Sequence, residues 1–150
     1  MAKEIMLTEH FSLEELTRSE LAERKGWDNK PSLIASANLV RLANFLEEVR
    51  KVIGKPLVIS SAYRSQILNN AVGSKETSQH RVGAAADFRV GGLSPKEVCE
   101  IIKNSDLQFD QCIQELSWVH ISIPSKPNET PRGQMLIIDN NGVRPYATNA

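Results

Sequence analysis

The sequence is poor in cysteine, carries no excess of either charge and has no long apolar run. Its two cysteines, Cys99 and Cys112, lack C-x-x-C spacing, which favours free buried thiols and argues against cysteine ligation of a metal. Eighteen Lys and Arg residues balance eighteen Asp and Glu residues, so the formal net charge is zero. The chain therefore has no overall basic field that would attract nucleic acid or an anionic membrane.

The first ten residues include charged side chains and no apolar run of signal-peptide length. Nowhere does the chain approach the roughly 20 consecutive apolar residues of a membrane span. We therefore expect a soluble protein that is made in the cytoplasm without a signal peptide. With 150 residues, 41% of them hydrophobic, the chain is expected to form one domain over 1–150, with flexible ends at about 1–6 and 146–150.

The hydrophobic pattern predicts helices mainly in the first part of the chain and strands mainly in the last. Apolar residues recur at helical spacing over 33–53, and shorter helices are predicted from Ser12 towards Gly26, over 65–71 and over 94–104. Strands are predicted over 57–61 and 84–90, followed by hairpins of 109–116 with 118–123 and of 135–138 with 143 onwards. This order predicts an α+β domain with helices packed on one face of a small antiparallel sheet.

Three polar residues lie in or beside these predicted strands: His80, Asp87 and His120. Side chains alternate along a strand, so Asp87 and His120 can point away from the apolar core. Two imidazoles and a carboxylate are suitable zinc ligands, with a fourth position left to water. Taken singly, each residue also has an ordinary explanation: His80 as a surface or hydrogen-bonded loop residue, Asp87 as a partner of a nearby arginine, and His120 as a half-buried sheet residue.

The motifs around these residues resemble a known family. Ser78-x-His80-x-x-Gly83-x-Ala85-x-Asp87 and Trp118-Val119-His120-Ile121-Ser122 are similar to the signature of the M15 zinc peptidases of the D-alanyl-D-alanine carboxypeptidase type, including small cell-wall-cleaving versions from phages and prophages. Upstream, Phe11–Leu16 and Ser60–Ser65 resemble the N-terminal segment and the serine-arginine motif of short members. The resemblance covers roughly residues 7–123 and implies a hedgehog/DD-peptidase-like fold.

The resemblance also implies roles for individual residues. His80, Asp87 and His120 would be the ligands of a zinc ion, and Glu115 would be the general base. Arg64 would orient the substrate, with Ser78 and Tyr63 lining the site, Trp118 beneath the ligand strand and Gln79 either facing substrate or exposed to solvent. From the residues alone, the alternative for Glu115 is a solvated charge at the end of a hairpin.

The function expected from the resemblance is hydrolysis of peptide bonds involving D-amino acids in peptidoglycan stem peptides, by a zinc-dependent carboxypeptidase or endopeptidase. The expected partner is a peptidoglycan peptide, with no nucleic acid and no membrane, and the expected state is a monomer. Without a signal peptide, such an enzyme would reach the wall through phage lysis or in a phage particle. The alternative is a non-catalytic wall-binding or virion assembly module that keeps the metallopeptidase fold.

Overall fold

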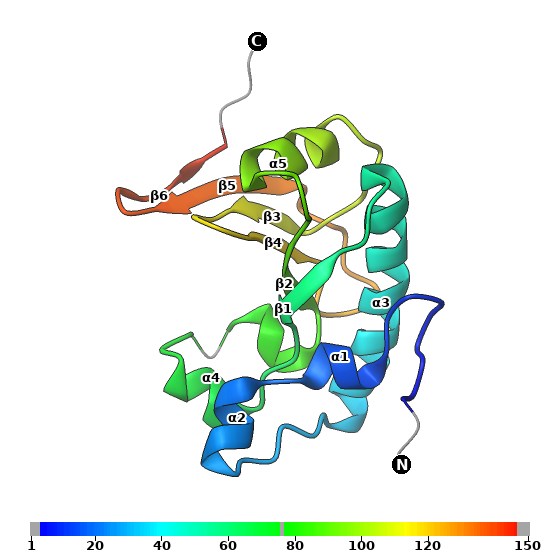
Figure 1. The fold of residues 1–150 in the computed structure, drawn as a ribbon, viewed down its shortest axis with the longest axis vertical. Helices are drawn as coiled ribbons and strands as arrows, with labels where there is room; N and C mark the ends of the chain where they lie inside the picture. The colour runs from blue at the N-terminus through cyan, green and yellow to red at the C-terminus, as the bar shows by residue number, and fades with distance from the viewer. Residues whose placement is uncertain (1–3, 76, 147–150) are drawn as a thin grey trace.

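The computed structural model describes residues 4–75 and 77–146, which form five α-helices, one 3-10 helix and one six-stranded sheet (Figure 1). Each longer helix begins at a serine that caps its first turn and satisfies a free backbone amide there. Among the described residues, no helix combines the length and apolar character needed to cross a membrane. The helices are α1 (Leu13–Thr17), α2 (Glu20–Lys25), α3 (Leu33–Ile53), α4 (Gln66–Ala71), η1 (Gln79–Val82) and α5 (Pro95–Lys103).

The sheet has the strand order β1-β2-β4-β3-β5-β6. All neighbouring strands are antiparallel except β3 and β5, which are parallel because the chain crosses from β4 to β5 over residues 123–133. This parallel pair differs from the purely antiparallel sheet that the sequence predicted, while the α+β class is confirmed. The strands are β1 (Val58–Ser61), β2 (Ala85–Arg89), β3 (Gln111–Gln114), β4 (Val119–Ser122), β5 (Gln134–Asp139) and β6 (Gly142–Pro145).

The helix predicted from Ser12 onwards is two helices in the structure. α1 ends at Thr17, and α2 starts after Ser19, whose hydroxyl accepts from the Ala22 amide. The second serine cap restarts the helix at a new angle, so one apolar pattern is divided between two short elements. A further helical turn, η1, was not predicted at all and carries His80.

One face of the sheet forms the core. Phe88, Val119 and Ile121 point to this face and are fully buried beneath α3 and α5, which contact each other (Figure 1). The predicted flexible ends lie partly outside the described residues. Tyr146, which the sequence placed in the flexible tail, is only 8% exposed, and its hydroxyl donates to Glu100 Oε1 at 2.6 Å.

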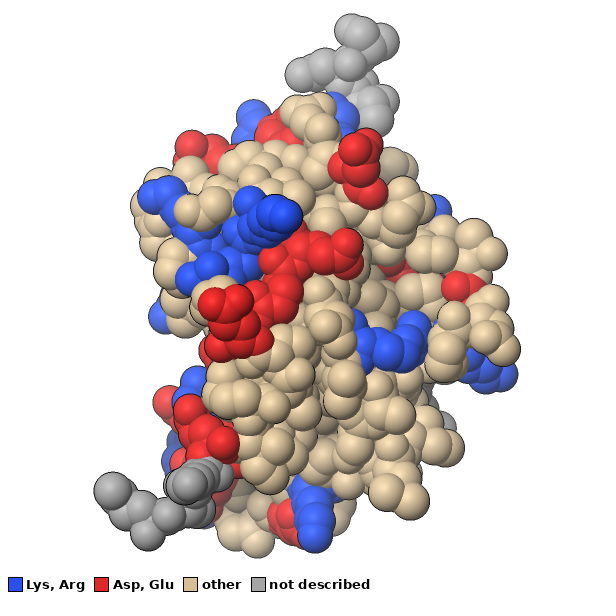
Figure 2. Space-filling model, turned by 90° about the vertical axis from the view of Figure 1, so that its right-hand side faces the viewer, with Lys and Arg blue, Asp and Glu red and all other residues tan. Residues whose placement is uncertain are grey.

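Charges of both signs are mixed on the surface. Figure 2 shows the side of the molecule on which α3 lies, where basic and acidic side chains are direct neighbours. That side therefore carries no extended field of one sign, in line with the balanced composition.

Gly83 connects η1 to β2 at a position where a side chain does not fit. Its φ is +76°, and a Cβ would lie 2.7 Å from the backbone oxygen of Ala35 in α3. We expect Gly83→Ala to lower the free energy of unfolding by at least about 2 kcal/mol, because the left-handed backbone alone costs about 1–2 kcal/mol and the contact adds to it. Urea unfolding measures this change.

Gly73 provides the matched control. Its φ is +74°, but a Cβ there would meet nothing within 4 Å. Gly73→Ala should therefore lower the free energy of unfolding only by the cost of the left-handed backbone, about 1–2 kcal/mol. Equal losses of stability in the two variants would contradict a close approach of η1 to α3.

Candidate metal centre and groove

The pairing of β2 with β4 places Asp87 directly opposite His120. Both side chains point to the face of the sheet away from the α3 core, as strand alternation predicted. His120 Nδ1 lies 3.0 Å from Asp87 Oδ1, and both side chains are largely buried. The two strands thus bring together residues that are 33 positions apart in the sequence.

His80 reaches the same point from η1. The hydroxyl of Ser78 caps this turn by accepting from the His80 amide, and the turn ends at Gly83. The imidazole is 2% exposed, and its Nδ1 lies 2.6 Å from the carbonyl oxygen of Ala62. A carbonyl only accepts hydrogen bonds, so Nδ1 is the protonated nitrogen and Nε2 keeps its lone pair. His80 Nε2 lies 3.4 Å from Asp87 Oδ1.

These three donor atoms fit a single metal ion. One ligand atom from each of His80, Asp87 and His120 lies within 4.8 Å of the others. A tetrahedral zinc ion with ligands at about 2.0–2.1 Å separates its donor atoms by roughly 3.3 Å, which agrees with the 3.4 Å and 3.0 Å distances to Asp87 Oδ1. The hydrogen bond from His80 to a backbone carbonyl is the outer contact by which metal-ligating histidines are usually oriented.

The electrostatics of the cluster favour the protonation states that metal ligands need, a neutral imidazole for His80 and an ionised carboxylate for Asp87. Burial lowers the pKa of His80, which favours the neutral imidazole that a metal needs. Burial alone would raise the pKa of Asp87, but the charges and hydrogen bonds of the two histidines hold it well below its ordinary value. The cluster therefore presents a carboxylate and a neutral imidazole at neutral pH.

Glu115 follows β3 and lies at the mouth of the same site. One of its carboxylate oxygens, Oε2, accepts a hydrogen bond of 2.8 Å from the indole nitrogen of Trp118, and its backbone amide donates to the Trp118 carbonyl. Burial and the nearby Asp87 raise the pKa of Glu115, while His120, the Trp118 hydrogen bond and Arg64 oppose that rise. Trp118 thus lies beside Glu115 in the groove, where it orients the carboxylate, and not beneath the ligand strand as predicted.

A groove of about 700 Å³ contains the metal-ligand cluster. Arg64 lines it, and the Arg64 amide donates to the His80 carbonyl at 2.9 Å. Burial lowers the pKa of the Arg64 guanidinium, with Asp87 and Glu115 opposing this, and its buried Nε has no hydrogen-bond partner. An arginine held in this way has donors left for a ligand in the groove.

Of the other predicted residues, Ser78 lines the groove and Tyr63 does not. Tyr63 is 7% exposed and belongs to the hydrophobic core. Arg64 lines the groove, whereas the side chain of the preceding Tyr63 packs into the core. Its expected contact with the site is not found in the structure.

An ion pair between the buried Asp110 and the exposed Arg132 supports the turn that carries His80. Asp110 accepts three hydrogen-bond contacts from the Arg132 guanidinium, which hold the pKa of Asp110 below its ordinary value. Asp110 also accepts from Gln79 Nε2 at 3.0 Å, and the same nitrogen donates to the carbonyl of Ile123. Gln79 therefore ties η1 to the residue before β3 and to the residue after β4, a role that the sequence did not reveal.

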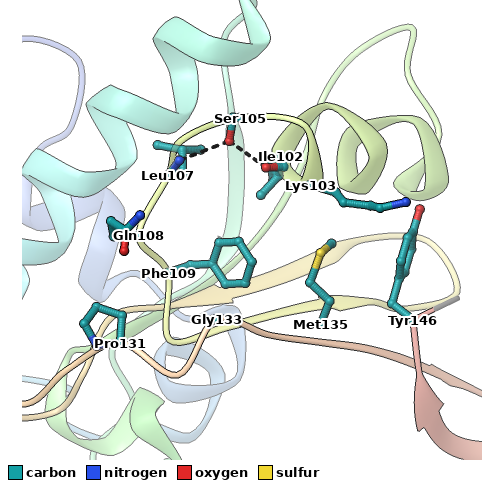
Figure 3. A pocket seen from close by; sticks show the side chains of 10 residues that line it. All are labelled: Ile102, Lys103, Ser105, Leu107, Gln108, Phe109, Pro131, Gly133, Met135 and Tyr146. Atoms are coloured by element: carbon teal, nitrogen blue, oxygen red, sulfur yellow. Dashed lines mark hydrogen bonds between the residues drawn. The ribbon is translucent and has the colours of Figure 1, made fainter. Parts of the chain in front are cut away.

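A second hollow, of about 430 Å³, lies on the opposite face of the sheet beside α5 (Figure 3). Phe109 and Met135 point into it, and Lys103 lies next to Tyr146 at one side, with its Nζ 5.9 Å from the ring centre. Met135 and the groove residue Leu136 are neighbours on β5 and point to opposite faces. The two hollows are therefore separated by the sheet.

Fold and site together define an α+β protein with a His-Asp-His cluster able to hold a metal ion in an open groove. The chain belongs to the Peptidase M15 family, whose model matches residues 9–122. This membership and the cluster indicate a metallopeptidase. No curated protein matches the sequence.

Proposed function

We propose that the protein is a zinc-dependent peptidase that hydrolyses peptide bonds involving D-amino acids in peptidoglycan stem peptides. The observation that carries this proposal is the meeting of His80, Asp87 and His120 with an acid, Glu115, and a cation, Arg64, in one groove. The M15 motifs in which these residues stand supply the substrate class. Two nitrogens and one oxygen suit zinc, and three protein ligands leave a position for water.

The protein's own residues then divide the work of hydrolysis. A zinc ion held by His80, Asp87 and His120 would lower the pKa of its bound water to about 7 and would polarise the scissile carbonyl. Glu115 takes the proton of the attacking water and delivers it to the leaving amine. The Trp118 indole holds one oxygen of Glu115, so the other oxygen is free to accept the proton. Arg64 donates hydrogen bonds to a substrate carboxylate or to the developing oxyanion.

The biological setting follows from the substrate. A monomer that acts on wall peptides must meet the wall, and we propose that it does so through phage lysis or as part of a phage particle. A terminal carboxylate held by Arg64 would support carboxypeptidase action. Binding of a cross-linked peptide along the groove would support endopeptidase action, and the products of digestion distinguish the two.

The proposal is tested by metal analysis and digestion of the same protein preparation. We expect one zinc per chain, release of new amine ends from purified peptidoglycan, loss of that release with a chelator and its return with added zinc. A panel of matched L- and D-peptides should show cleavage only where a D-residue flanks the bond.

The other outcomes are equally informative. Zinc at one per chain with no new amine ends would favour the wall-binding or virion assembly module. Cleavage of L-peptides alone would assign a different substrate to the same fold. Absence of zinc, with no activity restored by adding it, would overturn every metal-based function.

A further inference from the structure

The groove extends beyond the metal-ligand cluster onto strands β3 and β5. Across the sheet, Asp87 pairs with His120, His120 with Ile113, and Ile113 with Leu136. Residues paired in register share a face, so these four side chains form one row on the groove side. Ile138, two positions after Leu136, lies on the same side of β5.

Three apolar side chains on these strands form what we call the β5 shelf: Ile113, Leu136 and Ile138. All three line the groove, and Leu136 and Ile138 are partly exposed within it. The metal ligands, Glu115 and Arg64 lie within residues 9–122, which match the family model, whereas Leu136 and Ile138 lie after them. Ile113 lies within the matched residues, so the shelf combines one residue of the matched segment with two from the C-terminal hairpin.

The shelf and Arg64 lie on opposite sides of the cluster. Arg64 follows β1, the edge strand beside β2, while the shelf lies on β3 and β5, beyond β4. Neighbouring strands are about 4.8 Å apart, so the Leu136 backbone lies about 10 Å from that of His120. An extended peptide advances about 3.3 Å per residue, so a substrate residue about three positions from the scissile bond reaches the shelf.

We propose that the β5 shelf is a substrate subsite that binds the aliphatic part of a side chain about three residues from the scissile bond, on the side away from Arg64. This rests on the proposed peptidase function and deepens it, because it predicts that extended peptides are preferred to short ones. Removing apolar surface from water is favourable, and exposed apolar surface in a groove is removed from water only when a ligand covers it. The shelf can bind a purely aliphatic side chain, and it can equally bind the hydrocarbon stem of a long polar side chain.

The test compares the longest and the shortest stem peptides that the wild-type protein cleaves. We expect Leu136→Ala to reduce the ratio of kcat/KM for the long peptide to that for the short one about 10-fold, mainly through KM, because apolar subsites discriminate by about this factor per group removed. Leu33→Ala is the matched control, since Leu33 is 90% exposed on α3. The control should leave the ratio unchanged.

Calorimetric titration of the same peptides gives a second measurement that does not depend on turnover. Leu136→Ala should weaken binding of the long peptide about 10-fold more than binding of the short one, with the melting temperature and zinc content showing that the fold is retained. Equal effects on both peptides, or no effect on the long one, would overturn the subsite. Failure of the wild type to cleave any peptide would instead contradict the proposed function, and the titration would still decide whether the shelf binds peptide.

Discussion

Replacing His120 by alanine is expected to remove metal binding and, with it, peptidase activity. His120 supplies one of the three donor atoms of the cluster, and its Nδ1 lies 3.0 Å from Asp87. Loss of an outer-shell contact to a metal ligand already costs about 10–100-fold in affinity, so loss of a ligand should cost at least about 100-fold. Dialysis against a defined zinc concentration, followed by metal analysis, measures the change.

His120 is a better test than His80, because the His80 ring is buried and bonded to the Ala62 carbonyl, so its loss would also disturb the fold. His10→Ala is the matched control. His10 is the only other histidine of the sequence and lies beside Glu47, where it belongs to no described metal-ligand cluster. Zinc bound at one per chain in His120→Ala, or lost from His10→Ala, would contradict the assigned cluster.

The sequence was sufficient to predict which face of their strands Asp87 and His120 occupy, because that depends only on strand periodicity. In a two-residue repeat, placing Phe88 and Ile121 in the core sends Asp87 and His120 to the other face. Adjacency of β2 and β4 was not predictable, since strand order depends on long-range packing. The distance between Asp87 and His120 is therefore a result of the fold and not of either motif alone.

The parts that sequence reasoning missed depend on contacts between distant segments. The hydrogen bonds of Gln79 to Asp110 and Ile123 join residues more than 30 positions apart, and no local sequence pattern predicts them. The Trp118 bond to Glu115 is closer in sequence, at three positions, but it requires the tight turn between β3 and β4. The parallel placement of β5 beside β3 likewise follows from the path of residues 123–133, whose loop composition carries no signal for it.

The sequence motifs include all three metal ligands, but they do not include the whole wall of the groove. The ligands stand on a central pair of strands within the segment that matches the family, whereas the groove wall beyond Ile113 is built by β5. With the proposed subsite on β5, a change in the C-terminal hairpin is expected to alter which peptide is bound without moving a metal ligand.

Glu115→Gln is expected to lower kcat by about 10²–10⁴-fold while leaving zinc content unchanged, because the amide cannot take a proton from water. The Gln carbonyl can still accept from the Trp118 indole, so the side chain should keep its position. Single-turnover hydrolysis of a stem peptide, with metal analysis of the same sample, separates loss of proton transfer from loss of metal.

Glu48→Gln on α3 is the matched control, since Glu48 is exposed on the helix that packs against the other face of the sheet. It removes one carboxylate and should leave kcat and zinc content at the wild-type values. Full activity in Glu115→Gln would rule out Glu115 as the base. Because the ligand cluster does not include Glu115, that result would leave the metal site intact and require another group to accept the proton of the attacking water.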